Sequence, residues 1–325
     1  DLAGSMTFNQ KIYRLDNREF MPINVGPTQE FTIHACDQSL LNDAKSLVSK
    51  SWKCATPDQI VSYALRSCAG ASNVQIDSAQ PSRDYVAENI HPFQVVAQQA
   101  NVALDGDDPS FLHFMTFENG GKHYFTSLKR MCQGSAFRTF YHYETGVDGN
   151  HDYNRNVDKA IAFSFPCEFD LLSDLLNGID ENGQNINSVT TINPQNMLSE
   201  LIGGLGGGMG GCGIGSGNAK QSITDKGTNK TGCETDVEKH LLKRQARMGL
   251  LEKDKIALRI TVPWSPELNV GKLIGLVWNN KKSNQTDQLY GSGTYLVASL
   301  MHKIHFGGFA VTTMDCVAQT AGGGI

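Results

Sequence analysis

The clearest pattern of apolar and polar positions lies in the C-terminal part of the chain. Apolar side chains alternate with polar ones in four segments, each of which predicts a β-strand: residues 256–262, 272–278, 294–305 and 309–317. The first strand ends at Pro263, and Gly307-Gly308 joins the last two as a long antiparallel hairpin. Two earlier segments, 137–143 and 159–165, have the same character. The six strands predict a six-stranded barrel that is interrupted by an insertion.

Alternation also predicts which side chains of the closing hairpin point inward. One face of its first arm holds Thr294, Leu296, Ala298 and Leu300, and continues to His302 and Ile304. The more apolar face of its second arm holds Phe309, Val311, Thr313 and Val317. We predict that these two faces line the barrel interior. Aspartate at Leu296 or Val311 would then disrupt the fold, whereas aspartate at Ser299 would be tolerated.

The N-terminal half mixes strands with short helices. Residues 31–35 predict a strand, and Asp37 can cap a helix after it. That helix would bury five apolar side chains: Leu40, Leu41, Ala44, Leu47 and Val48. Thr56-Pro57-Asp58-Gln59 is a capping box that opens a second helix, which ends at Gly70.

A third helix and a hairpin complete this region. Pro92 opens the helix, and segments 111–117 and 123–128 flank the turn Glu118-Asn119-Gly120-Gly121, which predicts a β-hairpin. The helices and the hairpin together predict a small α/β module.

The middle of the chain differs from both ends in its composition and predicted elements. A short helix is predicted from Glu168 to Gly178, and a second capping box at Thr235-Asp236-Val237-Glu238 opens another. Between them, ten of the fifteen residues from Gly203 to Gly217 are glycine, which predicts a flexible loop. A phosphate-binding loop is not predicted, because Gly211, Gly213 and Gly215 follow more glycine instead of a strand.

Composition narrows the function classes. The 325 residues predict two or three domains, and 40% hydrophobic residues are enough to bury a core in each. The formal charge of −5 offers no broad cationic surface, so direct nucleic-acid recognition is not expected. No apolar run approaches 18 residues and no leader pattern opens the chain, so we expect no membrane anchor. The eight cysteines form no CxxC pair, which predicts reduced thiols made in a cytosol.

Three sets of residues are candidates for chemistry. The metal candidates are His302 and His305, which point to opposite faces of a strand and so cannot share one ion. The nucleophile candidates are Cys54, Cys167 and Cys316, none of which has a family signature around it. The carboxylates that could cleave a glycoside are Glu118, Glu144, Asp170 and Asp174, which sequence alone cannot pair. We therefore predict no catalytic, cofactor-binding or metal-binding residues, no cofactor, and a protein that is not an enzyme.

Two segments resemble the baseplate hub proteins of contractile-tailed bacteriophages, the family of late control protein D and the N-terminal region of type VI secretion spike proteins. The first is the central module, with Thr56-Pro57, Ile90-His91-Pro92-Phe93 and the hairpin strands from Phe111 and Tyr124. The second is the C-terminal region, with 266–271, a Gly-x-Tyr-x-Val pattern at 293–297, and His302. The resemblance covers residues 30 to 320 in order, and the glycine-rich segment is not part of the family pattern.

The resemblance implies an α+β, mainly β chain with two tandem hub-type β-barrel domains and an intervening small α/β module. Its expected boundaries are 1–54 for the C-terminal part of a first barrel, 55–135 for the module, 136–178 with 255–320 for the second barrel, and 179–254 for a glycine-rich loop and helix insertion. The opening strands of the first barrel would then precede Asp1.

The function implied by the resemblance is structural. It is a homotrimeric ring in the virion, at the tail baseplate, that joins the tail tube protein to the central spike protein and is assembled in the host cytoplasm. Tape measure and baseplate wedge proteins are further expected partners. Two alternatives stay open at this point: a tail-associated cell-wall hydrolase and a host-surface-binding module.

Overall fold

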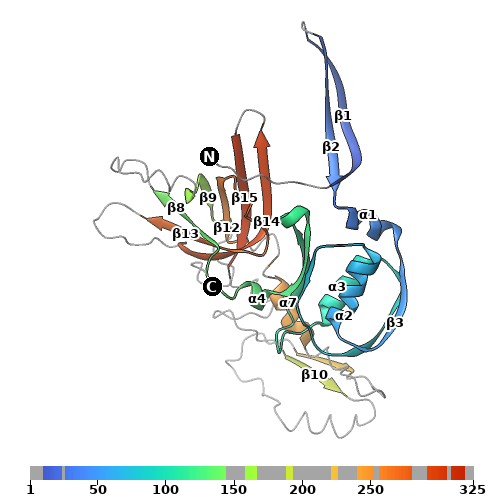
Figure 1. The fold of residues 1–325 in the computed structure, drawn as a ribbon. Helices are drawn as coiled ribbons and strands as arrows, with labels where there is room; N and C mark the ends of the chain where they lie inside the picture. The colour runs from blue at the N-terminus through green and yellow to red at the C-terminus, as the bar shows by residue number, and fades with distance from the viewer. Residues whose placement is uncertain are drawn as a thin grey trace.

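The computed structural model describes residues 10–23, 26–143, 158–166, 188–192, 221–225, 240–249, 251, 256–279, 291–305 and 309–318. These residues are mainly in β-strands and form a projecting hairpin, an α/β module and a curled sheet (Figure 1). The predicted helix from Glu168, the glycine-rich segment 203–217 and the capping box at Thr235 lie outside the described residues.

The curled sheet contains the six strands that alternation predicts. They are β8 (Arg138–Tyr143), β9 (Ala162–Ser164), β12 (Leu258–Pro263), β13 (Leu273–Asn279), β14 (Gly293–His305) and β15 (Phe309–Val317). Their order in the sheet is β8-β13-β14-β15-β12-β9. Its two ends approach each other at one bridge, where the Ala160 amide donates to the Tyr141 carbonyl at 2.9 Å. The second barrel implied by the resemblance stays a prediction.

The predicted facing of β14 is wrong in its first half. Tyr295 and Val297 lie in the core inside the sheet, whereas Leu296, only 3% exposed, packs on the outer face. A β-bulge between Val297 and Ser299 reverses the alternation, so Leu300 points inward as predicted. Ser299 is exposed.

The facing of β15 is also opposite to the prediction, although the extra residue of the bulge lies in β14 and not in β15. Met314 and Cys316 lie in the inner core, while Val317 belongs to the outer cluster. Apolar residues occur on both faces because the outer face is covered by the module. The outer cluster joins Leu128 of the module to Leu273 and Leu296 of the sheet.

The module folds as its helix signals predict. The capping box at Thr56 opens α2 (Pro57–Ser62), which continues as the π-helical turn η1 (Tyr63–Cys68) and ends before Gly70 at φ +70°. Ile60 and Leu65 are fully buried and pack with α3 (Pro92–Val102). The predicted hairpin is present as β6 (Phe111–Thr116) and β7 (Lys122–Ser127), with β4 (Val74–Ile76) parallel to β7.

The helix at Asp37 is shorter than predicted. Asp37 caps α1 (Gln38–Lys45) by accepting from the Ser39 amide at 2.7 Å, as expected. Leu40 and Leu47, however, are 48% and 52% exposed. The helix ends early because β3 (Val48–Ala55) begins three residues later and pairs with β5 (Arg83–Ile90). Residues 48–55 therefore share a sheet with the module that we predict from residue 55.

The remaining described elements are peripheral. A long hairpin of β1 (Lys11–Ile23) and β2 (Gly26–Cys36) stands away from the other elements (Figure 1). In that view β10 (Ser188–Ile192) and its parallel partner β11 (Gln221–Asp225) lie below the module, and α7 (Leu241–Gly249) lies beside it, next to α4. Arg244 of α7 donates to the carbonyls of Pro109 and Phe111 at 2.9 and 2.8 Å, which attaches that helix to the module.

Candidate functional site

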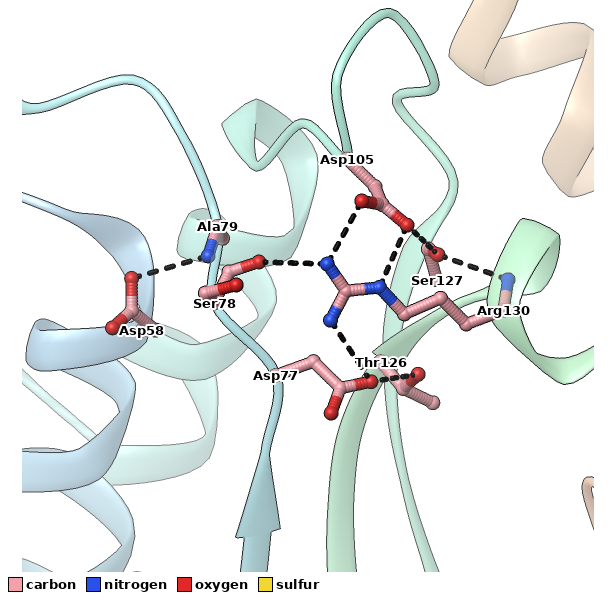
Figure 2. Close-up of polar contacts among 8 residues, drawn as sticks. All are labelled: Asp58, Asp77, Ser78, Ala79, Asp105, Thr126, Ser127 and Arg130. Atoms are coloured by element: carbon pink, nitrogen blue, oxygen red, sulfur yellow. Dashed lines mark hydrogen bonds and ion pairs between the residues drawn. The ribbon is translucent and has the colours of Figure 1, made fainter.

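One polar cluster in the module is centred on Arg130, in α4 (Leu128–Met131) (Figure 2). The guanidinium donates two hydrogen bonds of 2.8 Å to the Asp105 carboxylate. It also lies 3.5 Å from Asp77 and donates to the Ser78 carbonyl at 3.4 Å. Asp105 accepts a further bond from the Ser127 hydroxyl at 2.8 Å, and that hydroxyl caps α4. The cluster ties the segments after β4 and α3 to the end of β7.

The charges of this cluster stabilise each other. The hydrogen bond from Arg130 holds the pKa of Asp105 below its usual value, although burial opposes this. The same bond raises the pKa of Arg130. Both groups therefore stay ionised at neutral pH, and each already has several partners. Neither Arg130 nor Asp105 has a pKa shifted towards 7, as a general acid or base would need. The guanidinium already donates to the groups around it, so the cluster stabilises the fold and does not bind a substrate.

A second cluster joins α1 to the β6–β7 hairpin. The Ser39 hydroxyl lies 3.1 Å from His123 Nε2, and His123 Nδ1 lies 3.1 Å from His113 Nε2. The two imidazoles stack at 5.3 Å, and Phe93 packs against both. Burial, together with the neighbouring imidazole, lowers the pKa of His113 to about 4. Burial also lowers the pKa of His123, against the opposing effect of Asp37.

This order of hydroxyl and imidazoles does not make a nucleophile. Ser39 is only 3% exposed, so no substrate carbonyl can approach its oxygen. With both rings neutral at pH 7, one nitrogen donates and the other accepts along the line. The cluster is therefore a buried hydrogen-bond chain that holds α1 against the hairpin.

Glu118 lies at the junction of the module and the curled sheet. It accepts from the Tyr124 hydroxyl at 2.5 Å and forms an ion pair of 2.9 Å with Lys272, just before β13. Although burial opposes ionisation, these two partners lower the pKa of Glu118. A glycosidase acid needs the opposite shift. The other three carboxylate candidates, Glu144, Asp170 and Asp174, lie outside the described residues.

The same junction contains the segment 266–271 of the family resemblance. Asn269 is 2% exposed, and its side-chain oxygen accepts from the Phe117 amide at 3.2 Å. Gly271 has φ +82°, and a Cβ there would lie 2.7 Å from the Phe114 ring. This loop is thus held closely against the hairpin of the module.

The cysteine candidates have no nucleophile geometry. The expectation of reduced thiols is wrong at Cys54, which is disulfide-bonded, whereas the other four described cysteines are free. An oxidised sulfur has no thiolate to attack with. Burial raises the pKa of the Cys316 thiol, which makes it inert at neutral pH. Cys167 lies outside the described residues.

The histidine candidates do not converge either. His302 is half-buried and its Nδ1 lies 2.9 Å from the Thr312 hydroxyl, whereas His305 is exposed near the end of β14. Within the part of the chain that the structure describes, no group of three His, Cys, Asp or Glu side chains could hold a metal ion. Over those same residues, no helix is both long and apolar enough to span a membrane.

A cavity of about 680 Å³ lies where the module, α7 and the curled sheet meet. Leu128, Leu251 and Leu296 form part of its wall, and Arg247 lies 3.7 Å from Asp108 at its polar side. Asp107, Lys129 and Cys132 also line the cavity, and burial raises the pKa of the Cys132 thiol, so this thiol stays protonated at neutral pH.

No family model matches the chain, and no curated protein matches its sequence. Among solved structures, the chain is similar to the tail protein from Neisseria meningitidis MC58, with 10% identity, a TM-score of 0.51, and coverage of 95% of this chain and 79% of that one. It is also similar to the 43 kDa tail protein of prophage MuSo2 from Shewanella oneidensis, with 11% identity, a TM-score of 0.48, and coverage of 94% and 75%. The chain therefore has the fold of the neisserial tail protein.

Proposed function

We propose that the chain is a structural subunit of a bacteriophage tail, and more specifically the baseplate hub of a contractile tail. In this role three copies form a ring that joins the tail tube protein to the central spike protein. The supporting observation is the similarity to the neisserial tail protein, which extends over 95% of the chain. A likeness of this extent concerns the arrangement of the module and the sheet together, and not one common motif.

The contacts between the module and the curled sheet suit a part that transmits load. Glu118 with Lys272, and the Phe117 amide with Asn269, connect the two units through polar contacts of 2.9 and 3.2 Å. The outer apolar cluster continues the same contact. Within the Gly-x-Tyr-x-Val pattern, Tyr295 is 2% exposed and its hydroxyl donates to the Gly291 carbonyl at 2.6 Å. A rigid connection between the module and the curled sheet suits a ring subunit that joins two other assemblies.

The proposal extends to location and partners. The subunit would reside in the virion, at the tail baseplate, after assembly in the host cytoplasm. Tape measure and baseplate wedge proteins are additional proposed neighbours. The ring needs no cofactor and no catalysis.

Light scattering of the purified chain tests the ring. We expect an assembly of three times the chain mass of 35.4 kDa, and a three-fold ring by electron microscopy. A stable dimer, or a six-fold ring of identical chains in the particle, would contradict it. Immunogold labelling should place the protein at the tail end of the particle.

Peptidoglycan incubation separates the hub from a cell-wall hydrolase. We expect no turnover, and the same result for the Glu118→Gln variant. Turnover that is lost on changing one carboxylate would support the hydrolase instead. Binding of the isolated chain to host cells would support the surface-binding module.

A further inference from the structure

The cavity at the junction has walls from three parts of the chain. The module contributes the loop before β6 and the helix α4, and the curled sheet contributes residues of β14 and β15. The third wall is α7 with the turn after it, and α7 lies next to α4 (Figure 1). Its volume of about 680 Å³ is within the range of small-molecule sites. The cavity can therefore hold a small molecule.

One side of the cavity is apolar. Leu128, Leu296 and Val317 line it and are 7%, 3% and 5% exposed. Leu251 lines the same cavity from the turn after α7. The Cys132 thiol stays protonated at neutral pH and extends this apolar side, because a neutral thiol packs like a small hydrophobic group. This side suits the uncharged body of a ligand.

The other side holds a cation with available donors. Arg244 and Arg247 are three residues apart and so lie on the same side of α7. Arg244 donates through Nη1 to the carbonyls of Pro109 and Phe111. Arg247 Nε lies 3.7 Å from Asp108 Oδ1, which is too long for a hydrogen bond. Among the described residues, the Arg247 guanidinium has no acceptor at hydrogen-bond distance.

The nearby acid is already engaged. Asp108 accepts from the Ser110 hydroxyl and its side chain is only 9% exposed, whereas the Arg247 side chain is 32% exposed. The exposed side chains at the wall, Asp107 and Lys129, have opposite charges. A ligand therefore reaches the Arg247 guanidinium more easily than the Asp108 carboxylate. The planar fork of N–H donors matches a carboxylate, which accepts two parallel hydrogen bonds from it.

We propose that this cavity binds a small amphipathic carboxylate, with its head group on Arg247 and an unbranched alkyl chain along the apolar side. A fatty acid is the chemical class that combines the two parts. The bound molecule contacts the module, α7 and the curled sheet at once, and so stabilises the attachment of α7 at the junction. The site lies within a single chain, so it does not depend on the proposed role in a tail.

Calorimetric titration of the full chain with decanoate tests the head group. We expect decanoate to bind about ten-fold or more tightly than decanol or decyltrimethylammonium, because only the carboxylate accepts charged hydrogen bonds from Arg247. Arg247→Gln should lose this advantage for decanoate and leave the affinity for decanol unchanged. Arg66→Gln, at an exposed arginine that does not line the cavity, is the matched control and should bind decanoate like wild type.

The length of the alkyl chain tests the apolar side. From hexanoate to decanoate, each added methylene should strengthen binding about four-fold, because the methylene leaves water for the apolar wall. An affinity that does not change with length would mean that the alkyl chain stays in water, and would overturn the proposal.

Cys132 locates the ligand without a variant. N-ethylmaleimide at alkaline pH labels free thiols, and mass spectrometry follows each one. We expect saturating decanoate to slow the labelling of Cys132 several-fold and to leave Cys68 unchanged, since both thiols are free but only Cys132 lines the cavity. Absence of decanoate binding, equal affinity for the three head groups, or binding that leaves Cys132 unprotected overturns the site. Each of these results leaves the hub proposal standing.

Discussion

Replacing Arg130 with methionine tests the central fastening of the module. The change keeps most of the apolar stem but removes both 2.8 Å bonds to Asp105 and the ion pair with Asp77. Asp105, whose side chain is 16% exposed, then keeps only the Ser127 hydroxyl among these partners. The module must hold a partly buried carboxylate without its counter-charge.

The structure sets the size of the effect. Hydrogen bonds to charged groups contribute about 1.5–3 kcal/mol each, whereas exposed ion pairs contribute about 0–1 kcal/mol. The Arg130 side chain is 33% exposed, so the lower half of the first range applies. We expect a loss of about 2 kcal/mol in the free energy of unfolding, which lowers the melting temperature by roughly 4–8 °C.

Thermal unfolding at two pH values is the assay. The folded pKa of Asp105 lies below its ordinary 3.8, so the stability from this pair is present above pH 3.8 and is lost as the pH falls through the lower folded value. The gap between wild type and Arg130→Met should therefore close below pH 3.8. Lys129→Met removes the same charge from an exposed neighbour and is the matched control. If both variants melt within 1 °C of wild type at pH 7, Arg130 is not the fastening that we describe.

Three further predictions concern the junction, the sheet and the buried imidazoles. Gly271→Ala should destabilise the chain more than Gly106→Ala. Both glycines have positive φ, but of the two only Gly271 would place the new Cβ 2.7 Å from an aromatic ring. The clash should lower the free energy of unfolding, measured with denaturant, by a further ~1–3 kcal/mol. Val297→Asp should abolish cooperative melting, because Val297 is 1% exposed inside the curled sheet, whereas Met301→Asp, at a position 48% exposed on the same strand, should melt like wild type. His113 has a folded pKa of about 4 against 6.5, so the stability that it contributes is present above pH 6.5 and falls towards pH 4; His113→Gln should show a shallower fall in melting temperature, and an equal fall would refute the role of this ring.

The strands of the curled sheet could be predicted because their signals are local. Alternation and a proline end define β12, and the pair of glycines marks the turn between β14 and β15. The capping box at Thr56 and the cap at Asp37 were equally visible, since each needs only neighbouring residues. Alternation does not reveal a bulge, and a single inserted residue after Val297 was enough to reverse the predicted facing.

The polar clusters could not be predicted because their members are distant in the sequence. Arg130 is separated from Asp105 by 25 residues, and Ser39 from His123 by 84. Neither spacing is a known motif, and each of these side chains, considered alone, could equally be an ordinary solvent-exposed residue. Among these residues the sequence pointed only to Glu118, as a candidate glycosidase carboxylate in a chain predicted to have no catalytic residue, and its lowered pKa is opposite to the shift that a glycosidase acid needs.

The sequence by itself determined the class of several segments: six alternating strands for the curled sheet, and capped helices with a hairpin for the module. These features follow from periodicity and hydrogen-bond caps, which act over a few residues. Only the tertiary structure decided that the module covers the outer face of the sheet, so that Leu296 is buried on the side opposite to Tyr295. Whether a face is buried depends on which segment, distant in the sequence, packs against it, and the local pattern of side chains does not contain that information.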